Sequence, residues 1–159
     1  FLERRYKSHG EPPCSMRCPY NQRIGQEACF CLNHDHSSPS ESAKVELRCF
    51  DQALGCDPEA AAILNHVAWF RATTDAESYR NPQVSLKLVL RALKTCETFG
   101  TGYLPDILDT AARACYENGQ YAKALHYEQD ALRYEPHSHS YRDQLEMIRS
   151  KLGPLPAAP

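Results

Sequence analysis

The sequence predicts an all-α fold, a short stack of antiparallel helical hairpins. Three observations support this prediction. Apolar positions recur at a spacing of 39 residues, the segments that hold them have the 3.6-residue period of amphipathic helices, and no stretch alternates as a β-strand does. The chain has 159 residues, enough for one domain with one core. Its hydrophobic fraction of 42% and charged fraction of 24% are ordinary for a globular protein.

Three copies of one amphipathic helix carry the repeat. Ala53, Ala92 and Ala131 occupy one equivalent position. Two further equivalent positions hold leucine in every copy: Leu47, Leu86 and Leu125, then Leu54, Leu93 and Leu132. In the first copy Phe50 joins these positions on one stripe of a helix. We interpret this helix as the second of each hairpin.

A second series of apolar positions precedes this helix in each hairpin. Residues 63–68 and 107–112 align as its two copies, at an offset of 44 rather than 39. The extra residues fall in the connection 73–81, which is longer than the matching turn at 118–120. We therefore expect the first complete hairpin to carry an inserted loop.

Capping residues mark where the helices begin and end. Ser38 and Asn81 each precede a proline, and so each supplies an N-cap with Pro at the first helical position. Gly119 predicts a helix end, because glycine tolerates the left-handed conformation found there. Ser140 opens a last helix, which Gly153 ends.

Residues 106–136 resemble the tetratricopeptide repeat. The small residues, turn glycine, aromatic residue and final proline of that motif stand at Ala112, Gly119, Tyr121, Ala124, Ala131, Leu132 and Pro136. Residues 65–73 are similar to the Asn-x-x-Ala-Trp-x-x-Ala-Thr helix of a bacterial subclass. The resemblance covers roughly residues 40–151 and departs from the motif at Cys115 and Glu128, where aromatic residues are usual. It implies a short right-handed α-solenoid of the tetratricopeptide-repeat (TPR) type.

The composition divides the chain into three expected parts. Residues 1–37 form a cysteine-rich, irregular N-terminal arm with little helical period. Residues 38–152 form the TPR-like helical repeats, closed by a C-terminal capping helix from Tyr141 onward. Residues 153–159 form a tail rich in proline and alanine.

The resemblance also implies a concave surface lined by the first helix of each hairpin. Its outward positions are Asn65, Trp69, Asp109, Arg113 and Tyr116. We expect these residues to bind an extended peptide or a partner helix, because Trp and Arg are favoured anchors at interfaces. The alternative is that Trp69 packs between hairpins and that Arg113 is solvated.

The arm concentrates residues that pair or bind metal: Cys14, Cys18, Cys29, Cys31, His34 and His36. Two disulfides among the four cysteines would staple a segment that lacks its own core. A zinc site is the alternative, although the spacings C-x3-C and C-x-C fit paired zinc ligands poorly. Pairing with cysteines of the helices, or with another chain, is a third possibility. Of the helical cysteines, Cys49 and Cys115 are expected to be buried thiols.

No motif of a known catalytic chemistry is present in the sequence. It has no Gly-rich phosphate loop, no Gly-x-Ser-x-Gly elbow and no His-Glu-x-x-His. We therefore expect a non-catalytic scaffold without a cofactor, an accessory or structural subunit of a larger assembly whose partner is another protein or peptide. The alternative function is a metal-binding or redox-sensing module centred on the four arm cysteines, with zinc as its cofactor.

Charge, cysteine content and the N-terminus give further expectations. The net charge of −2 gives no support to nucleic-acid binding, and no apolar run approaches the ~18 residues of a membrane span. Eight cysteines favour export to the periplasm or the extracellular space. The chain begins at Phe1 without an initiator Met, so we expect a processed or truncated product. A fragment whose catalytic part lies upstream of Phe1 is a further alternative.

Overall fold

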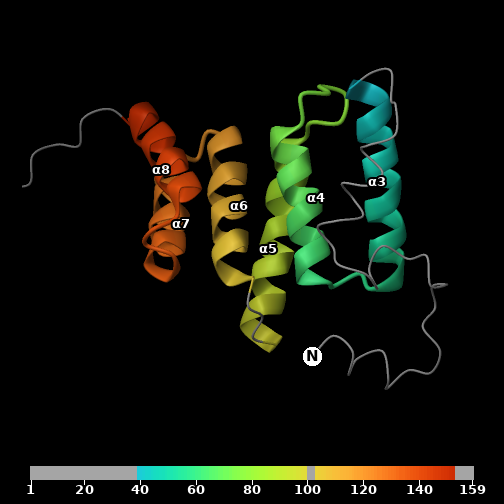
Figure 1. Cartoon of the computed structure of the whole chain (residues 1–159), viewed down its shortest axis with the longest axis horizontal. Helices are drawn as coiled ribbons and strands as arrows, with labels where there is room; N and C mark the ends of the chain where they lie inside the picture. The colour runs from blue at the N-terminus through green and yellow to red at the C-terminus, as the bar shows by residue number, and fades with distance from the viewer. Residues whose placement is uncertain (1–38, 100–102, 153–159) are drawn as a thin grey trace, which may run out of the picture. The chain divides into compact units, whose positions relative to one another are not determined.

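The computed structural model describes residues 39–99 and 103–152, and these residues form α-helices with no β-strand. The helices are α3 (Pro39–Cys56), α4 (Ala61–Thr73), α5 (Pro82–Phe99), α6 (Leu104–Glu117), α7 (Tyr121–Tyr134) and α8 (His139–Leu152) (Figure 1). The predicted all-α class is therefore confirmed. None of the helices in this described part is both long and apolar enough to cross a bilayer.

The chain divides into two compact units, residues 1–58 with α3 and residues 59–159 with α4 to α8. In the first unit, the buried positions of α3 are Ala43, Leu47, Phe50 and Ala53. These positions recur every three or four residues, so they lie on one face of the helix. The expected boundary after residue 37 lies outside the described residues.

In the second unit each helix packs against the next one along the chain. The pairs α4–α5, α5–α6, α6–α7 and α7–α8 are all in contact, and Figure 1 shows these helices in succession. Helix α4 also contacts α6, two helices further along. The first helices of the two predicted hairpins therefore lie next to each other, which creates the surface described below.

Small side chains at the helix contacts allow this close packing. Seven alanines in the second unit are completely excluded from solvent: Ala68, Ala92, Ala111, Ala112, Ala114, Ala124 and Ala131. Because each side chain is a single methyl group, the backbones of two helices can approach closely there. Larger buried residues, among them Leu64, Ile107 and Ile148, fill the spaces between the helices.

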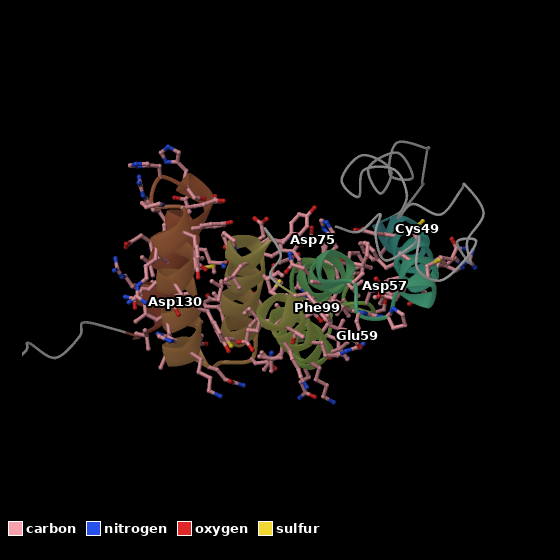
Figure 2. The ribbon with its side chains drawn as sticks, turned by 90° about the horizontal axis from the view of Figure 1, so that it is seen from below. Cys49, Asp57, Glu59, Asp75, Phe99 and Asp130 are labelled. Carbon is pink, nitrogen blue, oxygen red and sulfur yellow. The ribbon has the colours of Figure 1, made fainter. Side chains whose placement is uncertain are left out.

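Polar contacts between helices supplement the apolar packing. The Ser85 hydroxyl on α5 donates a hydrogen bond of 2.6 Å to the carbonyl oxygen of Ala68 on α4. At the end of α6, the side-chain amide of Asn118 donates a hydrogen bond of 2.7 Å to the carbonyl oxygen of Pro82. Arg91 on α5 forms an ion pair of 2.6 Å with Glu59, which precedes α4 (Figure 2). These contacts fix how α5 lies against its two neighbours.

The inserted loop predicted between α4 and α5 is present and is closed by hydrogen bonds to Arg71. The guanidinium of Arg71 donates to the carbonyl oxygen of Tyr79 at 3.0 Å, and its own carbonyl oxygen accepts from the Asn81 N–H at 2.8 Å. The Asn81 side chain then accepts from the Val84 N–H at 3.0 Å. Asn81 is therefore the N-cap of α5, as the sequence predicted.

The start of α8 differs slightly from the sequence prediction. The helix begins at His139, and its cap is Ser138, whose hydroxyl accepts from the Tyr141 N–H at 3.4 Å. A turn in which the Ser138 N–H donates to the carbonyl oxygen of Glu135, at 3.1 Å, places Ser138 at the entrance of the helix. Ser140, the predicted cap, therefore lies inside the first helical turn.

Helix α6 ends at Glu117, and Gly119 follows its C-cap with the backbone in the left-handed region at φ 72°, the helix-ending conformation that the sequence predicted. The Gln120 N–H donates to the carbonyl oxygen of Cys115 and the Gly119 N–H to that of Tyr116, both at 2.9 Å. This pair of bonds is a Schellman motif, which satisfies carbonyl groups at the end of the helix.

We expect Gly119→Ala to lower the free energy of unfolding by about 1 kcal/mol, because the left-handed conformation is strained for any residue with a Cβ. The added methyl group meets nothing within 4 Å, so backbone strain is the only cost. The matched control is Gly55→Ala in helix α3, which also meets nothing within 4 Å and should be neutral or stabilising. Urea denaturation followed by circular dichroism measures both, and equal effects would contradict the prediction.

Candidate functional site

A hollow of about 350 Å³ lies between α4 and α6. From α4 it is lined by Ala62, Asn65, His66 and Trp69. From α6 and the residue before it, it is lined by Tyr103, Asp106, Asp109 and Thr110. The α4 residues are spaced three, four and seven apart, so they share one helical face. The hollow is therefore formed by two facing helix surfaces.

Two aromatic side chains border this hollow and are open to solvent. Trp69 is 39% exposed and Tyr103 is 45% exposed. Trp is usually well buried in a folded protein, so an exposed Trp beside a hollow is informative. Both rings offer a flat apolar face and an electron-rich π-system to a ligand.

The polar atoms around the hollow are mainly acceptors. The side-chain oxygen of Asn65 is buried and has no hydrogen-bond partner among the described residues. The Asp106 carboxylate accepts a hydrogen bond of 2.8 Å from the Tyr141 hydroxyl and keeps further acceptor capacity. Burial lowers the pKa of His66, while the Asp106 charge opposes that shift, so the imidazole is neutral at pH 7. The described lining residues include no Lys or Arg.

Behind the hollow, a buried polar cluster joins α6, α7 and α8 through the side-chain amide of Gln144. The Gln144 nitrogen lies 2.9 Å from Asp109 Oδ1, 2.8 Å from the Asp109 carbonyl oxygen and 2.7 Å from Glu128 Oε2. The side chains of Asp109 and Glu128 also form a hydrogen bond to each other. Since Glu128 is 0% exposed, this is a carboxyl group held entirely inside the protein.

The two carboxyl groups of this cluster share a proton. Burial raises the pKa of Glu128 to about 8, the Gln144 hydrogen bond opposes this shift, and the Asp109 charge adds to it. Burial also raises the pKa of Asp109 to about 6, and the hydrogen bond from Glu128 limits that rise. Two carboxylates in one low-dielectric site cannot both ionise easily. At neutral pH Glu128 is mainly the acid that donates and Asp109 is mainly the carboxylate.

Arg113 and Tyr116, two of the five predicted binding residues, lie outside the hollow. Arg113 forms an ion pair of 2.9 Å with Glu117 and lies 5.8 Å from the centre of the Tyr116 ring. Its guanidinium also contacts the sulfur of Met147 on α8, at 3.5 Å. The structure therefore places Arg113 in contacts between and along helices.

The other three predicted residues, Asn65, Trp69 and Asp109, do line the same hollow. The sequence interpretation missed Asp106. It took His66 for a solvated surface group, and the structure shows His66 exposed, although it also lines the hollow. Helical spacing was the available signal, because His66 lies three residues before Trp69 and Asp106 three residues before Asp109. Tyr103 precedes its helix, so periodicity carried no information about it.

A second hollow, of about 840 Å³, lies among α5, α6 and α7. Its apolar lining is Leu90, Leu93, Leu104, Leu108, Tyr127 and Tyr134. The charged residues beside it have both signs, and Arg133 is paired with Asp130 at 2.7 Å (Asp130 is labelled on α7 in Figure 2). This surface is apolar and locally neutral, unlike the acidic hollow between α4 and α6.

The predicted disulfide or zinc residues lie outside the described residues: Cys14, Cys18, Cys29, Cys31, His34 and His36. In the described part, Cys115 is a free thiol that is 0% exposed, as predicted, whereas Cys49, which was also expected to be buried, is only half-buried. Burial raises the pKa of the Cys115 thiol. Cys56 is disulfide-bonded. No group of three or more potential metal ligands occurs within residues 39–99 and 103–152.

No protein-family model matches the chain, and no curated protein is significantly similar to it. The class defined by the described structure is an all-helical protein whose successive helices pack against one another.

We expect Glu128→Gln to stabilise the protein at pH 8 by on the order of 2 kcal/mol and to have little effect at pH 5. A raised carboxyl pKa means that the folded state holds a proton that the unfolded state has released. Stability from this group is therefore full below about pH 4.5 and is lost as the pH rises toward the folded value of about 8. The amide of the variant keeps both hydrogen bonds and does not titrate.

Urea denaturation at several pH values between 5 and 8.5 measures this difference. Glu146→Gln is the matched control, because Glu146 is exposed and pairs only with Arg149 in the described part, at 2.8 Å. Its effect should not change with pH by more than a few tenths of a kcal/mol. If the free energy of unfolding of the wild type and of Glu128→Gln changed in parallel with pH, the raised pKa of Glu128 would be contradicted.

Proposed function

We propose that the chain is a non-catalytic protein-binding scaffold of the TPR type, an accessory or structural subunit of a larger exported assembly. In this proposal the surface between α4 and α6 holds a peptide or a segment of a partner protein. The observation that carries it is the hollow of about 350 Å³ bordered by two exposed aromatic residues, Trp69 and Tyr103. Exposed aromatic anchors beside a concavity are typical of binding surfaces.

The pattern of helix contacts supports the TPR part of the proposal. In stacked hairpins each helix packs against its partner, and each first helix also packs against the next first helix. The contacts of α4 with both α5 and α6 follow that pattern. The buried alanines at the repeat positions, such as Ala92 and Ala131, support it as well.

The buried acid pair of Asp109 and Glu128 is the feature of this region that most resembles a catalytic group. Two carboxyl groups with raised pKa values are a frequent arrangement in hydrolases. Here, however, Glu128 is wholly buried and its neighbour Gln144 is bound to both carboxyl groups. A side chain enclosed in this way is unable to contact a substrate, which favours a structural role and supports the non-catalytic proposal.

The cysteine content supports the exported location. Disulfides persist in oxidising compartments and are rare in reducing ones. The chain has eight cysteines, and Cys56 at the end of α3 is disulfide-bonded. An exported assembly therefore fits the chemistry of the chain better than a cytosolic one.

Selection of a displayed random peptide library on the full chain tests the binding surface. Recovered peptides are synthesised and their dissociation constants measured on the wild type and on Trp69→Ala. We expect Trp69→Ala to weaken binding at least about tenfold, since loss of a central aromatic anchor costs more than 1 kcal/mol.

Leu90→Ala is the matched control, because Leu90 is similarly exposed, at 45%, but lines the other hollow. Its dissociation constants should stay within about twofold of the wild type. A library that yields no binding peptide, or peptides that bind Trp69→Ala as tightly as the wild type, would overturn the proposed surface.

A further inference from the structure

We infer that the hollow between α4 and α6 receives a basic side chain, arginine or lysine, from the partner segment. This inference rests on the proposed binding function and adds the chemical class that the surface selects. Three independent features of the hollow agree on it: the sign of its charge, its unused hydrogen-bonding groups and its aromatic border.

The charge of the hollow is negative and is not compensated by its own lining. Asp106 and Asp109 both face it, and the described lining residues hold no cation. Arg113 lies outside the lining, where its charge has only a minor lowering effect on the pKa of Asp109, and its guanidinium is paired with Glu117 at 2.9 Å. A cationic group entering the hollow therefore gains attraction from two carboxyl groups and meets no positive charge in the lining.

Two oxygen acceptors of the hollow require a hydrogen-bond donor. Asn65 Oδ1 is buried and without a partner among the described residues, and a buried acceptor left in this way costs free energy. The Asp106 carboxylate has one described donor, the Tyr141 hydroxyl, and can accept more hydrogen bonds. A guanidinium or ammonium group brings several donors and no acceptor, so it satisfies these atoms without adding an unpaired group.

The aromatic border fits the same ligand. Trp69 and Tyr103 stand at the hollow with 39% and 45% of their surfaces exposed. A cation over an aromatic face is stabilised by the ring quadrupole, most strongly by that of Trp. The methylene stem of Lys or Arg packs on the same rings, so one basic side chain uses both kinds of group.

Other ligands fit the hollow less well. A carboxylate would be repelled by Asp106 and Asp109 and would find only uncharged donors in the described lining, such as the Tyr103 hydroxyl and the His66 imidazole. A purely apolar side chain would contact the aromatic rings but would bury the carboxylates without a partner, which is costly. A basic side chain is the occupant that can pair with the carboxylates and also contact the aromatic rings.

Fluorescence provides the test, because Trp69 is the single tryptophan of the chain. The full protein is titrated at pH 7.5 with capped tripeptides that carry Arg, Lys, citrulline or Glu between two glycines. We expect saturable changes in Trp69 emission with the Arg and Lys peptides. The Arg peptide should bind at least about tenfold more tightly than the citrulline peptide, which has nearly the same shape and no charge.

Charge-removing variants locate the interaction. Asp106→Asn should weaken binding of the Arg peptide about five- to tenfold, because a charged acceptor becomes neutral while the contact with Tyr141 is retained. Asp130→Asn removes the same charge from the second hollow and should change binding by less than about twofold. Circular dichroism of each variant shows whether it is folded, and Asp109→Asn gives a second measurement from the other carboxylate of the hollow.

The outcomes separate this inference from the proposed function. Equal binding of the Arg and citrulline peptides, or an Asp106→Asn variant that binds as the wild type does, overturns the basic side chain. If library peptides still depend on Trp69 but contain no enriched Arg or Lys, the binding surface stands and only this inference fails. A library without any Trp69-dependent peptide removes the surface and the inference together.

Discussion

The side-chain amide of Gln144 joins the last three helices, beside the buried apolar clusters that they share. Its nitrogen reaches two acceptors on α6 and one on α7 within 2.9 Å, so α8 is tied to both of the helices that precede it. One of these bonds satisfies Oε2 of Glu128, a carboxyl group that is 0% exposed and would lose free energy if it were left without a partner. Because Asp109 is one of the acceptors, the same amide orients a carboxylate that faces the hollow between α4 and α6.

Asp109 therefore belongs to two environments at once. On one side it exchanges a hydrogen bond with Glu128 in the interior, and on the other it contributes charge to an open surface. A cation bound in the hollow favours the ionised form of Asp109, and that form is the better acceptor for the proton of Glu128. Ligand binding and the protonated state of Glu128 should consequently reinforce each other, since coupling between two sites acts in both directions.

Much of the fold was accessible from the sequence, because its signals are local. The 39-residue repeat placed alanines at helix contacts, and Asn81 and Gly119 marked a helix start and a helix end that the structure confirms. The sequence showed that Glu128 stands where the motif has an aromatic residue. It did not show the structural role of Glu128, because the partner Gln144 lies on another helix. Tyr103 was missed for a related reason: it enters the hollow from a turn, where no period applies.

The small size of this surface decides how it must work. Two first helices, α4 and α6, supply almost all of the hollow, whereas longer stacks of hairpins spread binding over many repeats. Affinity from apolar area alone is therefore small here, and area converts poorly into affinity in any case. What remains are directional contacts: two carboxylates, one unpaired amide oxygen and two exposed rings, all within about 350 Å³. Such contacts give selectivity for one side chain but little affinity for a long segment. The hollow is therefore better suited to recognising one residue of the partner than to binding the whole partner.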